Sequence, residues 1–178
     1  GAKGDNFSQG GESTRGWIKH FWDTVDNRNG DIDAKQNLKQ AYIIALGVND
    51  SNIKVEVGDA VTDINLDDYT KNADNFTGNY AGIIQRIQKA QPKAKFFVVT
   101  MLQDAPNRAP YNDVIRSMAD IFENVYVIDL EKYAPSCEKD GEFYKTFFMG
   151  GHLNTPGYLY TSWMMMTYID YIIRNNWS

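Results

Sequence analysis

The sequence is short of cysteine, histidine and positive charge, and each shortage argues against a class of protein. The 178 residues include one cysteine, Cys137, so no internal disulfide can form. Zinc sites need clustered Cys and His ligands, and the two histidines do not form such a cluster. Lys and Arg number 18 against 23 Asp and Glu, a net charge of −5 at pH 7. Nucleic acid is therefore not expected as a partner, because binding it relies on a positive surface.

Long apolar runs and a leader pattern are also missing. No uncharged apolar run reaches about 18 residues, so the sequence predicts no membrane-spanning helix. The first residues, GAKGDNFSQGG, do not have the pattern of a signal peptide. Either the mature protein never had one, or the chain is not the whole gene product. A secreted or periplasmic location requires that a leader was removed, and the oligomeric state stays open.

Three short, almost continuously apolar runs predict buried parallel strands. They are AYIIAL (41–46), KFFVVTM (95–101) and VYVIDL (125–130). Helical periodicity lies around them, at residues 17–25, 80–87, 114–122 and 155–173, with Thr155 as the expected cap of the last helix. Alternation of strands and helices predicts an α/β domain with a mainly parallel sheet. Three strands are few for such a sheet, so we expect the first strand to be missing from this chain.

The segment from Ser51 to Asn75 differs from the rest in charge. It carries six acids against two lysines, Lys54 and Lys71, for a net charge of −4. We interpret it as a surface excursion that leaves the carboxyl end of the 41–46 strand. Because ligands bind at that edge of open α/β sheets, walling a substrate cleft is the alternative role. The stretch DNRNGDID (26–33) lacks the acids and closing glutamate of a calcium loop.

Three polar stretches contain the candidate functional residues. The 41–46 strand ends in GVND, where Asn49 offers an amide donor to the ligand crevice, although a turn or capping role is the simpler alternative. The adjacent glycines of NFSQGGESTRGW let backbone N–H groups approach a bound group closely. The stretch GGHLNTPGY places His152 in a glycine-flanked loop, which suits proton transfer. The other histidine, His20, lies within a helical pattern and is interpreted as structural.

Taken in order, these stretches resemble the SGNH (GDSL-type) hydrolase family. That family has a Gly-Asp-Ser block with the nucleophile, a second block with a glycine, a Gly-x-Asn-Asp block, and a final Asp-x-x-His block. The resemblance covers nearly the whole chain. It implies that Gly11, Asn49 and His152 are the functional glycine, asparagine and base. It also implies that residues 1–178 form one domain, a three-layer α/β/α sandwich with a flavodoxin-like, mainly parallel sheet.

The nucleophile block of the family is absent from this sequence. No Gly-Asp-Ser occurs, and GDN (4–6) lies too close to Gly11 for a strand, turn and helix to intervene. No apolar run precedes it either. We therefore expect the first βα unit to lie upstream of residue 1 or to have been removed. Neither Ser8 nor Ser13, which flank the glycines, is expected to be the nucleophile.

The final block departs from the family in its acid. Met149 stands three residues before His152, where the family has aspartate. In a Ser-His-Asp triad this acid fixes the histidine tautomer, and neutralising it lowers turnover by about 10⁴. A backbone carbonyl or a carboxylate such as Glu142 could orient the ring instead, and the sequence does not choose between them.

The resemblance implies hydrolysis of carboxylic esters through a serine acyl-enzyme, with no metal or organic cofactor. His152 would move the proton, while the Gly11 N–H and the Asn49 amide would hold the oxyanion. Small, glycine-rich surroundings favour a short acyl group such as acetyl on a carbohydrate, so the expected partner is a small-molecule or carbohydrate ester. The alternative is a catalytically inactive SGNH-fold domain that binds a glycan or ester. A phosphate or nucleotide binder ranks last, because the sequence has no phosphate-binding glycine motif.

Overall fold

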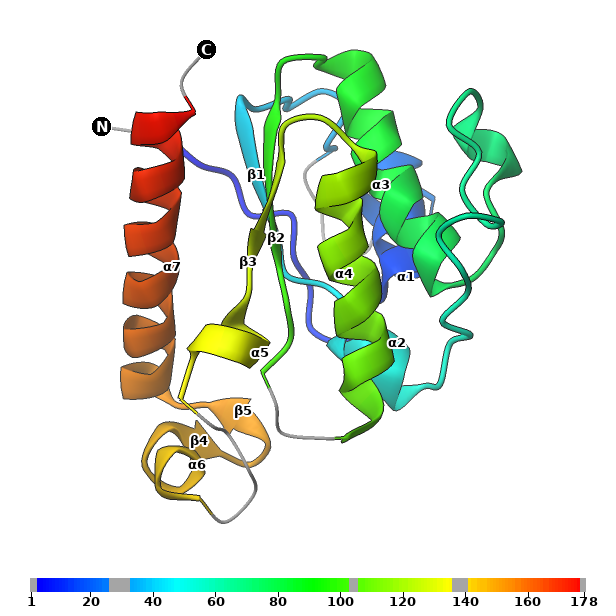
Figure 1. Cartoon of the computed structure of the whole chain (residues 1–178). Coiled ribbons are helices and arrows are strands. Elements are labelled where there is room, and N and C mark those ends of the chain that lie inside the picture. Colours follow the sequence, from blue (N-terminus) through cyan, green and yellow to red (C-terminus); the bar gives the residue numbers. More distant parts are fainter. Residues whose placement is uncertain (1–2, 26–32, 103–105, 136–140, 177–178) are drawn as a thin grey trace.

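Three parallel strands form the central sheet, in the order β1-β2-β3 (Figure 1). The computed structural model describes residues 3–25, 33–102, 106–135 and 141–176, so Cys137 and most of the DNRNGDID stretch lie outside it. The strands are β1 (Ala41–Ile44), β2 (Lys95–Val99) and β3 (Val125–Ile128). All three expected strands are confirmed, and each ends two residues before its apolar run does.

Helices connect the strands and cover both faces of the sheet. They are α1 (Thr14–Trp17), which continues into a π-helical segment Ile18–Trp22, α2 (Val48–Asn52), α3 (Phe76–Ala90), α4 (Ala109–Ile121), α5 (Leu130–Tyr133), α6 (Glu142–Phe147) and α7 (Thr155–Asn175). Short 3-10 turns occur at Tyr69–Lys71 and Pro106–Arg108. A small antiparallel hairpin, β4 (Phe148–Met149) and β5 (His152–Leu153), lies between α6 and α7.

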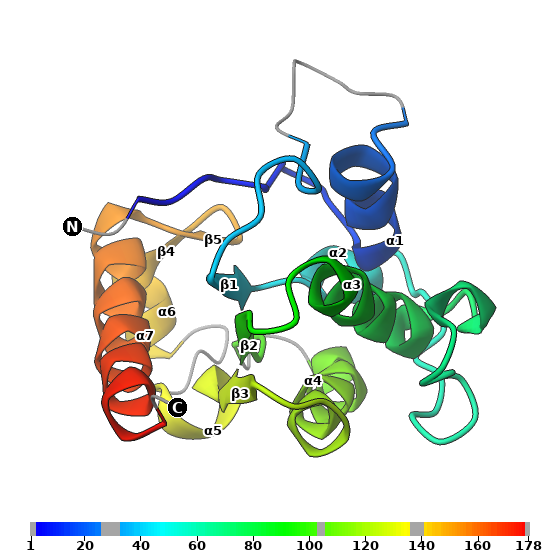
Figure 2. The same cartoon turned by 90° about the horizontal axis from the view of Figure 1, so that it is seen from above.

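The layers follow from the alternation of side chains along each strand. In β1 and β2, Tyr42, Ile44, Phe96 and Val98 point to one face and pack with α1, α3 and α4. Phe97 and Val99 alternate with them and form a second cluster with α7 on the opposite face. Seen from above, α7 lies on one side of the sheet and α1, α3 and α4 on the other (Figure 2). The expected three-layer α/β arrangement is therefore present.

Helix starts follow local capping chemistry. The side chain of Asn75 accepts a hydrogen bond from the Gly78 N–H (2.9 Å) and caps α3. At α7 the cap is Asn154, whose side chain accepts from the Gly157 N–H (2.9 Å). The prediction that Thr155 caps this helix was wrong by one residue, because the asparagine before it supplies the acceptor.

The first helix is shorter than its periodicity indicates. Trp17 and Trp22 are buried, as expected for core aromatics. Val25, included in the predicted stripe, lies beyond the helix and is exposed. The π-helical segment from Ile18 to Trp22 ends at Asp23, whose N–H bonds the Ile18 carbonyl, and α-helical spacing therefore does not continue to Val25.

The acidic segment 51–75 is a surface excursion beside α3, as predicted. Short-range contacts hold it: Asp63 accepts bonds from the Asp59 N–H (2.7 Å) and from the side chain of Asn75 (2.8 Å). Both views place the segment on the opposite side of the molecule from the β4–β5 hairpin (Figures 1 and 2). This segment therefore does not form the wall of a cleft that faces His152.

Helix α7 has more apolar surface than it buries. Ile169 and Ile172 are buried against the sheet, whereas Tyr158, Leu159 and Met166 are exposed. The helical periodicity over 155–173 therefore does not mark one buried stripe, because apolar side chains extend around most of the helix. Nowhere in the described ranges is a helix both long and apolar enough to span a bilayer.

Candidate functional site

Gly47 makes the sharp turn from β1 into α2. Its φ of +126° lies in a region that side-chain-bearing residues rarely adopt. A Cβ there would also lie 3.3 Å from Met101 Sδ and 3.4 Å from the Phe76 ring. A glycine is therefore needed for the chain to leave the core strand and present the next residues at the carboxyl edge of the sheet.

Asn49 joins this turn to the glycine-rich stretch. Its Nδ2 donates a hydrogen bond to the backbone carbonyl of Glu12 (2.9 Å), the residue after Gly11. Gly47, not Asn49, occupies the cap position of α2, so Asn49 does not cap this helix. Within the described ranges the second N–H of the Asn49 amide makes no hydrogen bond. That N–H is available to a further acceptor.

Gly11 forms an exposed backbone turn next to Asn49. Its φ is +83°, and a Cβ at this position would meet nothing within 4 Å. The requirement for glycine is therefore conformational at this position and not a matter of space. The structure thus brings the region around Gly11 into hydrogen-bond contact with Asn49.

A buried clamp lies beneath this contact. The Asp50 carboxylate accepts the Thr14 hydroxyl (2.7 Å) and the Thr14 N–H (3.1 Å to each oxygen), and both residues are fully buried. Burial raises the pKa of Asp50, although the bonds from Thr14 oppose that shift. Asp50 therefore tethers the start of α1, 36 residues away in sequence.

Glu12 and His20, which lie before and after α1 in the chain, support the same region. His20 Nδ1 lies 2.8 Å from the buried Glu12 Oε2, so the interpretation of His20 as structural agrees with its surroundings. The Ser13 hydroxyl oxygen accepts the Gly16 N–H (3.1 Å) and caps α1. Ser13 therefore has a structural partner, in line with its exclusion as nucleophile.

His152 lies on the β4–β5 hairpin and not in a loop. It pairs with Met149 in the hairpin register, and Gly150 and Gly151, with φ of +60° and +84°, form the turn between them. In Figure 1 the hairpin and α2 lie beyond the same, carboxyl-terminal end of the sheet. His152 is exposed, and within the described residues it forms no hydrogen bond or ion pair with Gly11 or Asn49.

No carboxylate orients His152 within the described part of the chain. Met149, at the position of the family aspartate, is 75% exposed. Glu142, one of the two alternatives, points away into solvent and forms an i,i+3 ion pair with Lys145 (3.5 Å). The other alternative was a backbone carbonyl, and no carbonyl of the described residues accepts a hydrogen bond from the His152 imidazole.

Packing of aromatic rings fixes the hairpin on α7. Phe143, Phe147, Phe148 and Tyr160 form a connected group with ring centroids 4.7–6.4 Å apart. Asn154 adds two bonds across the turn, from its N–H to the Phe147 carbonyl and from its Nδ2 to the Thr146 carbonyl (2.8 Å each). The position of the His152 backbone is thus set by tertiary packing that sequence periodicity did not indicate.

A charged network at the same edge was missed by the sequence reasoning. Arg116 of α4 donates to Asp129 (2.7 Å) and to Glu131 (2.5 Å), just after β3. The Thr100 hydroxyl, which follows β2, donates to Asp129 as well (3.1 Å). Burial acts to raise the pKa of Asp129, but the bonds from Arg116 and its other donors outweigh it and lower the pKa. No local pattern marks these residues, because their partners come from separate elements.

Comparison with known protein families matches residues 1–159 to the family described as GDSL-like lipase/acylhydrolase. The chain belongs to this family. The resemblance inferred from the three polar stretches is thereby confirmed, and the parallel three-stranded sheet agrees with the α/β fold of the family. No curated protein gives a significant match.

Membership of the GDSL-like lipase/acylhydrolase family defines the protein as an esterase- or lipase-like hydrolase of esters. The match spans all three stretches that carry Gly11, Asn49 and His152. Among the described residues, no group of three or more His, Cys, Asp or Glu side chains is arranged to hold a metal ion.

Proposed function

We propose that the protein hydrolyses short-chain carboxylic esters, such as acetyl groups on a carbohydrate, through a serine acyl-enzyme. The serine attacks the ester carbonyl, and His152 removes its proton and later returns it to the leaving alcohol. The Gly11 N–H and the free N–H of Asn49 stabilise the oxyanion. The serine itself comes from a strand that the described residues do not include.

The contact between Asn49 and Glu12 carries this proposal. A hydrogen bond of 2.9 Å fixes the amide of Asn49 with one N–H bound to protein and the other unbound in the described structure. An oxyanion donor is effective when it is oriented before the charge develops, because no reorganisation is then needed. The adjacent turn at Gly11 exposes backbone at the same place. In this proposal the Gly11 N–H is the second donor to the same oxyanion.

The test is the loss of the Asn49 donor in the protein produced with any segment that precedes Gly1. Asn49→Ala should lower kcat for p-nitrophenyl acetate by about 10²–10³ and leave KM nearly unchanged. Asn52→Ala is the matched control, because Asn52 is an exposed residue of the same helix. Unchanged turnover in Asn49→Ala would refute the assigned role. Labelling by a serine-directed phosphonate tests the acyl-enzyme separately.

A non-catalytic ester- or glycan-binding domain is the second candidate, and the surroundings of His152 favour it. Met149 replaces the acid, and no described carboxylate contacts the imidazole. Such a domain would bind an acetylated sugar without turnover and would not react with the phosphonate. Hydrolysis that the phosphonate abolishes excludes this candidate, whereas calorimetric binding without hydrolysis supports it.

A further inference from the structure

Glu12 lies where the glycine-rich turn, α1 and Asn49 meet. Its carbonyl accepts the hydrogen bond from the Asn49 amide (2.9 Å). Its N–H donates to the Gln9 carbonyl (3.3 Å), and this bond closes the turn that contains Gly11. The orientation of Glu12 therefore sets the orientation of the Asn49 amide.

The backbone that precedes Glu12 fixes this residue only loosely. Gly10 and Gly11 have no side chains to pack, and a Cβ at either position would meet nothing within 4 Å. The bond to the Gln9 carbonyl, at 3.3 Å, is longer than the usual range of about 2.7–3.2 Å and is therefore weak. Glu12 thus depends on its own side chain for a fixed orientation.

The side chain of Glu12 is buried and bound to His20. Oε2 of Glu12 lies 2.8 Å from Nδ1 of His20, and the two side chains are 8% and 15% exposed. Because a carboxylate only accepts hydrogen bonds, Nδ1 carries the proton of this contact. Among the described residues, His20 is the one side chain that hydrogen-bonds the Glu12 carboxylate. A hydrogen bond to a charged group in a buried position holds its partners firmly.

Gly16 and the π-helical segment make this pairing possible. The Glu12 side chain crosses α1 directly over Gly16, where a Cβ would overlap with Oε1 of Glu12. His20 comes four residues later, within the π-helical segment Ile18–Trp22. Single π-helical turns are rare and occur frequently at functional sites. The spacing of Glu12, Gly16 and His20 therefore lets the carboxylate reach the imidazole along one side of the helix.

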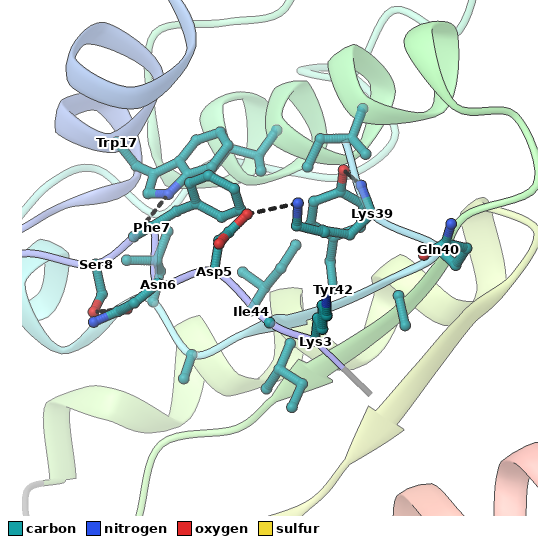
Figure 3. A pocket seen from close by; sticks show the side chains of 17 residues that line it. Lys3, Asp5, Asn6, Phe7, Ser8, Trp17, Lys39, Gln40, Tyr42 and Ile44 are labelled. Carbon is teal, nitrogen blue, oxygen red and sulfur yellow. Dashed lines mark hydrogen bonds and ion pairs between the residues drawn. The ribbon is translucent and has the colours of Figure 1, made fainter. Parts of the chain in front are cut away.

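Other contacts hold α1 in place without this pair. Thr14 is bound to the buried carboxylate of Asp50. Trp17 Nε1 donates to the Phe7 carbonyl (2.9 Å), on the segment that leads to the glycine-rich turn (Figure 3). Loss of the imidazole should therefore free the Glu12 side chain and leave the helix where it is.

We propose that Glu12 and His20 are positioning residues for the oxyanion donor Asn49. The imidazole fixes the Glu12 side chain, and the Glu12 carbonyl then holds the Asn49 amide with its second N–H directed toward the substrate oxygen. In this role neither Glu12 nor His20 contacts the substrate. The effect on catalysis rests on the proposed function, whereas the effect on the Asn49 amide does not.

The test replaces His20 in the protein produced with any segment that precedes Gly1. His20→Leu should lower kcat for p-nitrophenyl acetate about 10-fold and leave KM nearly unchanged, because the donor is still present but less well oriented. His20→Asn should restore most of kcat, since its amide nitrogen takes the place of Nδ1. His20→Gln places its amide nitrogen near Nε2 and should not restore kcat. Arg15→Leu, which breaks an exposed ion pair of α1 with Asp74 (3.1 Å), is the control and should change neither constant.

A double-mutant cycle separates positioning from a general effect of the substitution. In an Asn49→Ala background, His20→Leu should not lower kcat further, because the donor that it positions is already gone. The NMR signals of the Asn49 side-chain amide give a readout that needs no activity. They should shift in His20→Leu and return in His20→Asn. Gly16→Ala displaces the Glu12 carboxylate but keeps both partners, so it should act like His20→Leu.

Each other outcome decides the proposal. Additive losses of kcat, equal kcat in His20→Asn and His20→Gln, or unchanged Asn49 amide signals in His20→Leu overturn it. If His20→Leu does not fold, Gly16→Ala decides in the same way. Shifted amide signals with unchanged kcat support the positioning and count against the proposed role of Asn49 in catalysis. A loss of kcat in Asn49→Ala without any effect of His20→Leu does the reverse.

Discussion

Removing the carboxylate of Asp50 should destabilise the protein far more than removing an exposed carboxylate. Asp50→Ala leaves the Thr14 N–H and hydroxyl without their acceptor in a fully buried site. Each unsatisfied buried donor costs about 1–3 kcal/mol, and relief from burying a charge offsets part of that. We therefore expect a loss of about 2–4 kcal/mol in the free energy of unfolding. Asp67→Ala, at an exposed site, should change it by less than about 0.5 kcal/mol.

A double-mutant cycle with Thr14→Val separates the clamp from other effects of the substitution. Thr14→Val removes only the hydroxyl donor (2.7 Å) and keeps the backbone bonds to Asp50, so about 1–2 kcal/mol should be lost. Because the two residues are in direct contact, the double variant should lose clearly less than the sum of the single losses. Urea unfolding of all four proteins gives these values. Additive losses, or an Asp50→Ala cost no larger than that of Asp67→Ala, would refute the reasoning.

Further predictions concern the carboxyl edge and the turn into α2. Arg116→Ala breaks two partly buried ion pairs and should cost about 2–4 kcal/mol, whereas Arg174→Ala, in an exposed i,i+4 pair, should cost about 0.3–0.5. Because the pKa of Asp129 is lowered in the folded protein, its stabilisation is present above the unfolded pKa and lost as pH falls through the folded pKa. The stability difference between wild type and Asp129→Asn should therefore shrink below about pH 4, measured by thermal unfolding. Gly47→Ala should cost about 1–3 kcal/mol, and Gly10→Ala, whose Cβ would meet nothing within 4 Å, should be nearly neutral; equal costs would contradict the argument from φ.

The strands and helices that short stretches of sequence specify by themselves were predicted well. The runs that became β1, β2 and β3 were found because buried parallel strands are almost continuously apolar. Helix α4 was found from its periodicity, and Pro110 pre-sets the backbone of its first turn. Errors appeared at boundaries, as at Thr155, where two adjacent residues could both cap and only the geometry of Asn154 decides.

The candidate site was predictable only as separate stretches. The order of glycines, GVND and the late histidine indicated the family, and the structure brings Asn49 to the turn after Gly11. The bond to the Glu12 carbonyl and the Asp50–Thr14 clamp cross between elements 36 or more residues apart, and no local pattern encodes such partners. The role of His152 is a proposal for the same reason. The groups that would orient its imidazole are distant in sequence, and no local pattern identifies them.

The bond from Asn49 to the Glu12 carbonyl also bears on the chemical ageing of the protein. Deamidation would turn this amide into an aspartate of nearly the same shape that has no proton to donate. Its oxygen would then face the Glu12 oxygen across 2.9 Å, and two acceptors at that distance repel each other. A single altered atom would therefore loosen the junction of α1 and α2, and under the proposed function it would also remove an oxyanion donor.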